Sequence, residues 1–337
     1  MLNVGLIGFG SISRVHRKAY ADLEKLGVAR LVCAYDVEAG AFTKNVLNNL
    51  DTTAEKIEEN IRFYTDLDEM LNKESLDFVD ICIPSYLHAK MSCELLGRGY
   101  NVLCEKPMAL SYADCREMIC TAKKNGRELM IGQCLRFAPS YSYVKNIVSE
   151  KRYGKILGAF FNRLSTSPTW GWKNWFADPS LSGGAVTDLH IHDLDYVRYV
   201  LGEPDAVSAR ATSSFSIHDT VHTALFYKDF PVTAIADWTH IGTKFRAESY
   251  IDFEDATVTF TGNTVSIYNK KDASCENVEL ESYTGYYGEI AYFCDVVSGK
   301  EKNERNTPES AARSIRLVEL VKESINASGE ITPVRYE

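Results

Sequence analysis

The chain has 337 residues, of which 45% are hydrophobic and 25% charged, a composition typical of a globular protein with room for two domains. Its formal net charge of -9 argues against nucleic acid or an anionic membrane as the main partner, because both attract clustered Lys and Arg. No apolar run approaches the ~20 residues of a transmembrane helix. The N-terminal sequence also lacks a signal-peptide pattern, so we expect a cytoplasmic protein without a membrane partner.

The nine cysteines indicate free thiols. None has CxxC spacing, and several lie in apolar runs, such as Cys82 in "VDICIP" and Cys104 in "NVLCEKP". Buried free thiols in a reducing compartment explain this pattern best. The spacing does not match a zinc site, so we expect no metal.

The first part of the chain alternates apolar strands with helices. The predicted strands cover residues 2–7, 29–36, 76–84, 100–107 and 128–137, and helices are predicted at 12–26, at 88–97 and from the N-cap Ser111 to about 125. Continuous apolar strands between helices indicate a parallel sheet covered on both faces. We therefore predict an α/β fold whose first domain, residues 1–125, is a doubly wound parallel sheet.

From about residue 155 the predicted strands follow each other closely and alternate apolar with polar residues. This pattern predicts an α+β domain over residues 126–337 with a mostly antiparallel sheet. Helices interrupt it near 188–201 and 287–297. A last helix over 308–326 begins after Thr307 as N-cap, and it can pack back on the first domain.

The segment "GFGSIS" after the first strand has the spacing of a dinucleotide-binding loop. Gly8 permits the tight turn, Gly10 lets a pyrophosphate approach the backbone, and Ser13 is small enough for helix–strand packing. N–H groups at the start of the following helix would face the phosphates. Asp36 ends the second strand, where a carboxylate binds ribose hydroxyls and repels a 2′-phosphate. The sequence therefore favours NAD over NADP.

Glu105 and Lys106 close a strand of the predicted parallel sheet, in "CEKP" at 104–107. Ligands of doubly wound sheets lie outside the carboxyl ends of the strands, so Lys106 has a reason to point into a cleft. Glu105 can hold the ammonium or contact a ribose. A loop salt bridge between the two residues is an equally good interpretation of these residues alone.

The segment "GGAVTDLHIHDLDYV" at 183–197 carries five titratable side chains, namely Asp188, His190, His192, Asp193 and Asp195. On one helix, Asp188, His192 and Asp195 fall within an arc of about 60°, so we expect Asp195 to support the other two or to contact substrate. His190 and Asp193 project from the apolar side, where they can pair as structural residues. The two imidazoles lie about 200° apart, which does not suit one metal ion.

Three indoles lie upstream of this segment, at Trp170, Trp172 and Trp175. Indoles near carboxylates suit the recognition of a polyol, because apolar C–H faces stack on the rings while hydroxyls find acceptors. For any single Trp, a hydrophobic loop that covers the sheet is an equally good interpretation.

The chain resembles the Gfo/Idh/MocA family of oxidoreductases along essentially its whole length. Three motifs occur in the family's order: "GFGSIS", "CEKP" and GGxxxDxxxHxxD, here "GGAVTDLHIHDLD". The resemblance implies a Rossmann domain followed by a domain with a large open sheet, through which a homodimer or homotetramer is expected to form. It also implies NAD(P)-dependent hydride transfer at a carbinol carbon of a sugar, inositol or related cyclic polyol.

The resemblance also implies site residues. By motif, Lys106, Asp188 and His192 fall on catalytic positions. The implied cofactor-binding residues are Gly8, Phe9, Gly10, Ser11, Ile12, Asp36, Pro84, Ser85, His88, Glu105 and Lys106. The implied substrate-binding residues are Lys106, Arg136, Trp170, Trp175, Asp188, His192 and Tyr286.

In this scheme His192 accepts the hydroxyl proton near neutral pH and Lys106 stabilises the developing alkoxide. Asp188 hydrogen-bonds the substrate or orients the pair. The same residues work in reverse, so a keto-sugar reductase, or a glycoside-processing enzyme acting through a keto intermediate, is an alternative. A sugar-sensing regulator that binds NAD without turnover is the alternative of another class, and the intact set of Lys106, Asp188 and His192 weighs against it.

Overall fold

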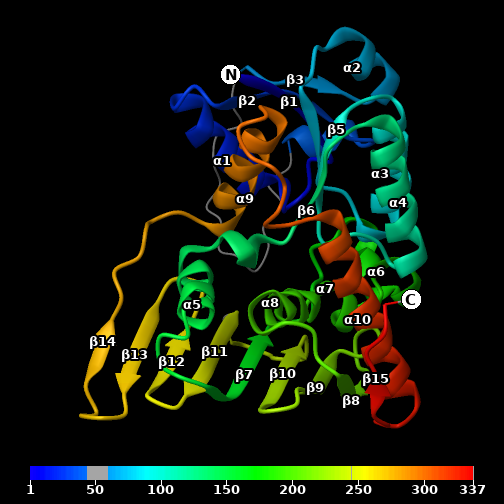
Figure 1. The fold of residues 1–337 in the computed structure, drawn as a ribbon. Coiled ribbons are helices and arrows are strands. Elements are labelled where there is room, and N and C mark those ends of the chain that lie inside the picture. Colours follow the sequence, from blue (N-terminus) through cyan, green and yellow to red (C-terminus); the bar gives the residue numbers. More distant parts are fainter. Residues whose placement is uncertain (44–59, 244, 337) are drawn as a thin grey trace.

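The computed structural model describes residues 1–43, 60–243 and 245–336, which form two units that are each built on one sheet (Figure 1). The first sheet has six strands in the order β3-β2-β1-β4-β5-β6, and all of its pairs are parallel. Its strands are β1 (Leu2–Ile7), β2 (Ala29–Tyr35), β3 (Arg62–Tyr64), β4 (Phe78–Ile81), β5 (Asn101–Glu105) and β6 (Leu129–Gly132). This confirms the predicted doubly wound sheet, and the order reverses between β1 and β4, where such sheets bind ligands.

Helices cover both faces of the first sheet (Figure 1). One face carries α1 (Ser13–Lys25) and α9 (Gly285–Val297), the other carries α3 (His88–Gly97) and α4 (Tyr112–Asn125), and α2 (Leu67–Lys73) packs against β2 and β3. Although α9 comes late in the chain, its Ile290 and Phe293 share a core with Val4 and Leu6 of β1. Residues 1–125 alone therefore do not complete the core of the first unit.

Helix ends follow the predicted caps. The Ser111 hydroxyl accepts a hydrogen bond from the backbone N–H three residues later, and α4 stops at Gly126, which has the left-handed φ of 60°. The Thr307 hydroxyl caps α10 (Pro308–Asn326) in the same way. Each cap satisfies an N–H group that lacks a partner within the helix.

The second sheet has nine strands in the order β14-β13-β12-β11-β7-β10-β9-β8-β15. The neighbours β7 and β10 run parallel, and the other pairs are antiparallel, which confirms the prediction of a mostly antiparallel sheet. Its strands are β7 (Ile156–Leu164), β8 (Ala206–Thr212), β9 (Thr220–Phe226), β10 (Pro231–Asp237), β11 (Arg246–Phe253), β12 (Ala256–Phe260), β13 (Val265–Asn269), β14 (Cys275–Asn277) and β15 (Thr332–Pro333).

One face of this sheet packs against α5 (Pro139–Ser149), α8 (Ile191–Leu201) and α10 (Figure 1). Side chains therefore alternate along β7, with Phe161 buried under the helices. Phe160 points to the other side and stacks on Tyr250 of β11, with ring centroids 5.6 Å apart. We call this second side, which also carries Tyr268, the open face, because no helix of the described ranges covers it in Figure 1.

The helix α10 connects the two units. It packs against α4 of the first unit and against α8 and β8 of the second. Its Glu319 accepts a hydrogen bond of 2.8 Å from the backbone N–H of Tyr112, at the start of α4. Within the described ranges, the structure contains no helix that is long and apolar enough to cross a membrane.

Candidate active site

A cleft of about 1290 Å³ is lined by residues of both units. The first unit contributes the segments that follow β1, β2, β4 and β5. The second contributes α7 (Gly184–Asp188), α8, the carboxyl ends of β7 and β10, and the start of β11. The cleft therefore lies outside the carboxyl ends of the parallel strands, at the switch point of the first sheet, as predicted.

The cofactor half of the cleft contains all of the predicted cofactor-binding residues except His88. Gly8 has a φ of 93°, and a Cβ there would lie 2.5 Å from the carbonyl oxygen of Cys82. A Cβ on Gly10 would meet no atom within 4 Å, so the backbone faces open space. Ser13 is fully buried and donates a hydrogen bond of 2.7 Å to the Gly10 carbonyl oxygen. This cradle fits a pyrophosphate held against backbone N–H groups.

Asp36 follows β2 at the edge of the cleft and is held by two backbone groups. Its carboxylate accepts hydrogen bonds from the N–H of Phe9 at 2.8 Å and from the N–H of Glu38 at 2.9 Å. The first bond ties Asp36 to the glycine loop itself. The carboxylate is thereby pre-positioned at the end of the cleft where a ribose is expected.

His88 does not take the predicted place in the cofactor site. Its side chain is buried, and its ring nitrogens lie 2.7 Å from the Pro107 carbonyl oxygen and 2.9 Å from the Ile83 carbonyl oxygen. His88 therefore braces the two loops that form the cleft wall, and the expectation of a direct cofactor contact is corrected. Sequence placed it near these loops but could not show which way the ring points.

Lys106 and Asp188 meet at the wall of the cleft. The Lys106 Nζ donates to the Asp188 carboxylate at 3.1 Å and to the Asp188 carbonyl oxygen at 2.9 Å. Their side chains are 14% and 16% exposed, so both remain reachable from the cleft. Of the two interpretations left open for Glu105 and Lys106, the loop salt bridge is not formed: the Lys106 Nζ contacts Asp188, and Glu105 accepts from the Lys106 backbone N–H.

His192 lines the same cleft. Burial lowers its pKa well below the ordinary value, and the nearby positive charges of Lys106 and Arg163 lower it further. The imidazole is therefore neutral around pH 7, which leaves one ring nitrogen with a free lone pair. Its Nδ1 has no hydrogen-bond partner among the described residues.

Asp188 and His192 do not share one helix, contrary to the prediction. Asp188 ends α7, and His192 lies in the first turn of α8, which begins at Ile191. The two glycines before them serve packing, since a Cβ on Gly184 would lie 2.1 Å from the carbonyl oxygen of Ile217. The helical wheel nevertheless grouped Asp188 with His192 correctly, because both line the cleft.

His190 and Asp193 are fully buried. The prediction that they pair with each other is wrong. The His190 Nε2 lies 3.0 Å from the Thr223 hydroxyl. Asp193 accepts two hydrogen bonds, of 2.9 and 3.0 Å, from the Arg163 guanidinium. The partners of these groups thus come from β9 and β7, which a pattern within one helix cannot reveal, and the His190 Nδ1 keeps no hydrogen-bond partner among the described residues.

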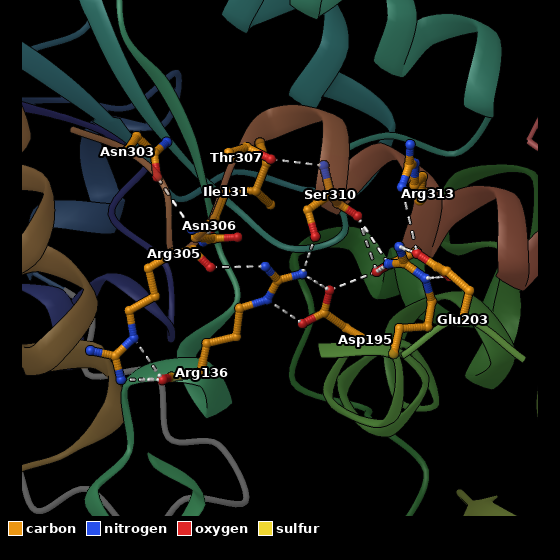
Figure 2. Close-up of polar contacts among 12 residues, drawn as sticks. Ile131, Arg136, Asp195, Glu203, Asn303, Arg305, Asn306, Thr307, Ser310 and Arg313 are labelled. Atoms are coloured by element: carbon orange, nitrogen blue, oxygen red, sulfur yellow. Dashed lines mark hydrogen bonds and ion pairs between the residues drawn. The ribbon is translucent and has the colours of Figure 1, made fainter. Parts of the chain in front are cut away.

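Arg136 and Asp195 form a buried ion pair away from the cleft (Figure 2). The Arg136 Nε and Nη2 donate to the two Asp195 oxygens at 2.8 and 2.6 Å, and both side chains are 1% exposed. Arg136 also donates to the Ser310 hydroxyl of α10 and to the Arg305 carbonyl oxygen. The expected substrate contact of Arg136 is therefore corrected. Of the two roles expected for Asp195, the structure favours a supporting role over a substrate contact.

Aromatic side chains form part of the wall of the cleft, and Trp170 and Trp175 line it as predicted. Trp175 stacks on Phe176 with ring centroids 3.9 Å apart, and Phe176 packs edge-to-face against Trp238 at 6.0 Å. Tyr286 also lines the cleft, next to the ring of His16. This wall suits the apolar C–H faces of a sugar ring.

Sequence reasoning missed Arg163 and Trp238, which also line the cleft. They lie near the carboxyl ends of β7 and β10, the two parallel neighbours of the second sheet, where Leu164 pairs with Asp237. The carboxyl-end rule would have pointed to both residues, had the parallel pairing been known. That pairing joins strands about 70 residues apart and leaves no local signal.

Comparison with known proteins identifies the family. Residues 2–133 match the model of an oxidoreductase family with an NAD-binding Rossmann fold, and residues 141–275 match the GFO/IDH/MocA C-terminal domain. The chain therefore belongs to the GFO/IDH/MocA family of oxidoreductases, and its first unit is that family's NAD-binding Rossmann domain. This confirms the resemblance found in the three motifs and the expectation of NAD as cofactor.

Several curated relatives act on sugars by name. The chain is 33% identical over 52% of its length to 2,7-anhydro-N-acetylneuraminate hydratase of Mediterraneibacter gnavus, of which the match covers 43%. It is 27% identical over 83% of its length to D-glucoside 3-dehydrogenase of Escherichia coli, of which the match covers 74%. The chain spans about half the length of the first curated relatives it matches.

Solved structures share the fold. Levoglucosan dehydrogenase in complex with NADH and levoglucosan superposes with a TM-score of 0.82 at 20% identity, over 99% of this chain and all of that one. The WlbA dehydrogenase from Bordetella pertussis, in complex with NADH and UDP-GlcNAcA, gives a TM-score of 0.80 at 19% identity, over 100% of this chain and 99% of that one. At these identities the likeness establishes the architecture of both units.

Proposed function

We propose that this chain is an NAD-dependent oxidoreductase that transfers a hydride between its cofactor and a carbinol carbon of a sugar, inositol or related cyclic polyol. The observation that carries the proposal is that Lys106 and Asp188, 3.1 Å apart, line the same cleft as His192 and the glycine loop. The names of the relatives, which include levoglucosan, D-glucoside and D-apiose dehydrogenases, support a sugar as the substrate.

Each of the three residues has a role that its surroundings support. NAD, when bound, supplies the hydride acceptor. His192 is held neutral by burial and by neighbouring cations, so it can take the proton of the substrate hydroxyl. Lys106 donates a hydrogen bond to the same oxygen and stabilises the developing negative charge. Asp188 holds the ammonium in place through the 3.1 Å contact.

A panel of inositols, aldoses and glycosides with NAD tests the proposal through the absorbance of the reduced nicotinamide. We expect turnover of at least one member, and a loss of about 10²-fold or more in kcat for Lys106→Met. Lys123→Met, on the surface of α4, is the matched control and should keep full activity. Turnover that is unchanged in Lys106→Met would overturn the assigned roles.

A glycoside-processing reaction through a keto intermediate is the second candidate. The similarity to a hydratase and to 1,5-anhydro-D-fructose reductase of Ensifer adhaerens favours it, since these names describe reactions other than oxidation. An enzyme of this kind regenerates its cofactor, so product should exceed a sub-stoichiometric amount of NAD without net reduced nicotinamide. A sugar-sensing regulator would instead bind NAD tightly and turn over no member of the panel.

We propose NAD rather than NADP as the preferred cofactor. Asp36 is held at the end of the cofactor half by its bond to the Phe9 N–H, and the next residues are Val37 and Glu38, which offer no cation for a 2′-phosphate. Asp36→Ser should therefore raise kcat/KM with NADP relative to NAD. If the ratio of kcat/KM with NADP to kcat/KM with NAD is unchanged, Asp36 does not contact the adenosine ribose.

We further propose a homodimer or homotetramer formed through the open face. Tyr250 and Tyr268 on this face are 40% and 45% exposed, and exposed aromatics of this size mark interaction surfaces. Light scattering after size exclusion should give a multiple of the 37.8 kDa chain, and Tyr250→Glu should lower it. A monomeric wild type contradicts this.

The nine free cysteines, all within the described ranges, support the cytoplasm as the location.

A further inference from the structure

A cluster of buried titratable side chains lies at the end of β5, next to Lys106. It brings together His16 of α1, Asp80 of β4, Glu105 of β5 and Glu289 of α9, which are 0–3% exposed. The hydride-transfer scheme uses none of these side chains as acid or base. Four titratable groups gathered in the interior need a reason, because burying a charge is costly unless it is paired.

His16 is the centre of this cluster. Its Nδ1 lies 2.7 Å from the Asp80 carboxylate and its Nε2 lies 2.8 Å from the Glu105 carboxylate. Ionised carboxylates only accept hydrogen bonds, so both ring nitrogens must carry a proton. Burial alone would lower the pKa of His16, but the charge of Asp80 and its hydrogen bond raise the pKa well above the ordinary value. His16 is therefore an imidazolium that bridges two carboxylates.

Glu289 differs from the other two carboxyl groups. Neither of its side-chain oxygens has a hydrogen-bond partner among the described residues, and the side chain is fully buried. Burial and the negative charge of Glu105 raise the pKa of Glu289 well above the ordinary value. Glu289 is therefore a neutral acid, and the cluster of Asp80, His16, Glu105 and Glu289 keeps one net negative charge.

The other titratable groups around the cluster stay uncharged. The Tyr20 hydroxyl donates to Asp80 at 2.8 Å, and burial raises the pKa of Tyr20 well above its ordinary value. Burial raises the pKa of Cys82 to about 12, and burial raises the pKa of Tyr286 as well. On the cleft side, the Lys106 Nζ is occupied by Asp188, and Arg14 and Arg163 are further cations that line the cleft.

Glu105 is the member of the cluster that reaches the cleft. Its second oxygen accepts from the Lys106 backbone N–H at 3.0 Å, so the carboxylate is tied to the backbone of the proposed catalytic lysine. A Cβ at Gly132 of β6 would lie 3.3 Å from the Glu105 carboxylate, and the absence of a side chain there leaves room for it. Glu105 thus lies on the reactive side of the cleft, and Asp36 lies on the ribose side.

We propose that His16 holds Glu105 as a permanent carboxylate at the reactive side of the cleft, where its fixed negative charge makes the protein prefer oxidised over reduced NAD. The two forms of the cofactor differ by one positive charge on the nicotinamide ring, and a nearby anion stabilises the charged form. His16 is in this scheme a positioning residue, and Glu105 sets the preference. The proposal rests on the proposed function, because Lys106 marks where the reactive ring binds.

The test measures the dissociation constants of the full chain for NAD and for NADH by titration calorimetry. For Glu105→Gln we expect the ratio of the NAD constant to the NADH constant to rise about fivefold or more. Glu289→Gln is the matched control, since an amide replaces a neutral acid of the same shape, and its ratio should equal that of the wild type at pH 7. A Glu105→Gln variant that weakens both forms equally would overturn the proposal, as would a Glu289→Gln variant that shifts the ratio.

The role of His16 in holding Glu105 as a carboxylate is tested by measuring the same ratio of dissociation constants for His16→Gln at several pH values. Without the imidazolium, two buried carboxylates face each other with no cation between them. Their repulsion favours uptake of a proton by the pair, so the ratio should increase as pH falls from 8 to 6. The wild-type ratio should stay constant over this range. A His16→Gln variant that folds and keeps a pH-independent ratio contradicts the role of His16. If this variant does not fold, the comparison of Glu105→Gln with Glu289→Gln still decides whether Glu105 sets the preference.

A metal ion is the competing explanation of the cluster, because ligand atoms of His16, Glu105 and Glu289 lie within 4.8 Å of one another. The direct 2.8 Å contact between His16 and Glu105 favours a shared proton. Elemental analysis that finds a stoichiometric divalent ion, lost in Glu289→Gln, would overturn the assignment. A wild type that binds neither NAD nor NADH would instead refute the proposed function, whereas equal binding of both forms refutes the charge preference alone.

Discussion

Two aspartates of one motif, Asp188 and Asp195, form ion pairs with opposite characters. Asp188 pairs with Lys106 at the cleft wall, where both side chains are about 15% exposed. Asp195 pairs with Arg136 at 1% exposure, and Ser310 and Ser314 of α10 complete its surroundings (Figure 2). The first pair is accessible from the cleft, as the proposed roles of both residues require. The second is sealed, with all of its hydrogen bonds made by the protein, so it can only hold elements together.

The same contrast separates the two histidines of the motif. His192 lines the cleft, whereas His190 is fully buried with its Nε2 against the Thr223 hydroxyl, and the Nδ1 of each ring lacks a hydrogen-bond partner among the described residues. Burial makes both neutral, so titration alone does not distinguish them. Access to the cleft is what separates a reacting group from a structural one, and four substitutions test that distinction.

The largest effect is expected at His192. His192→Asn should lower kcat by about 10²–10⁴-fold, because the group proposed to take the substrate proton is lost. The affinity for NAD and the melting temperature should stay close to those of the wild type. Steady-state kinetics on the substrate found in the panel, with calorimetry for NAD, measure this. Full activity in His192→Asn would show that the base lies elsewhere.

Asp195→Asn should cost about 3–5 kcal/mol in the free energy of unfolding, because it leaves the Arg136 charge buried without its partner. Urea denaturation followed by circular dichroism measures the loss. The double variant Arg136→Met/Asp195→Leu removes both charges and should recover part of it. A cost below 1 kcal/mol for Asp195→Asn would mean that water reaches this pair.

His190 should appear in the pH dependence of stability. Its folded pKa is lowered to about 3 by burial, while the unfolded pKa is about 6.5. Its contribution is complete above pH 6.5 and is lost as pH falls toward 3, since the unfolded chain takes up the proton first. His190→Gln should reduce this loss by up to ~1.4 kcal/mol per pH unit. Unfolding curves at pH 7 and pH 5 that keep the wild-type difference would contradict the assignment.

The smallest effect on stability is expected at Asp188. Asp188→Asn should change the free energy of unfolding by about 1 kcal/mol or less, because the pair with Lys106 borders the cleft and is reached by water. Activity should nevertheless fall, since Lys106 loses its anchor. Urea denaturation and steady-state kinetics, both on the same preparation, compare the stability and the activity of Asp188→Asn with those of Asp195→Asn. Equal stability costs for the two aspartates would remove the distinction between the pairs.

Local patterns predicted much of this molecule correctly. Alternating apolar strands and helices indicated the parallel sheet, and caps at Ser111 and Thr307 located two helix starts. The motif spacing brought Lys106, Asp188 and His192 to one cleft. These predictions succeed because backbone geometry and capping depend on residues close in sequence.

Other predictions failed where the partner is distant in the chain. The predicted pair of His190 with Asp193 is replaced by contacts to β9 and β7, and Arg136 turns from a substrate contact into a buried partner of Asp195. His88 turned from a cofactor contact into a brace between loops. A pattern along one segment shows which side chains share a face, but not what that face meets.

The sequence by itself determined the class of the first sheet, the glycine loop, the Asp36 carboxylate and the three groups of the proposed reaction. Only the tertiary structure decided which titratable groups are sealed and which border the cleft. It also decided that α9 returns to bury Glu289 beside Glu105 and His16, almost 300 residues from the start of the chain. Burial and charge pairing arise from residues brought together by the whole fold, and these determine protonation, so the chemistry of a side chain is settled only when its neighbours are in place.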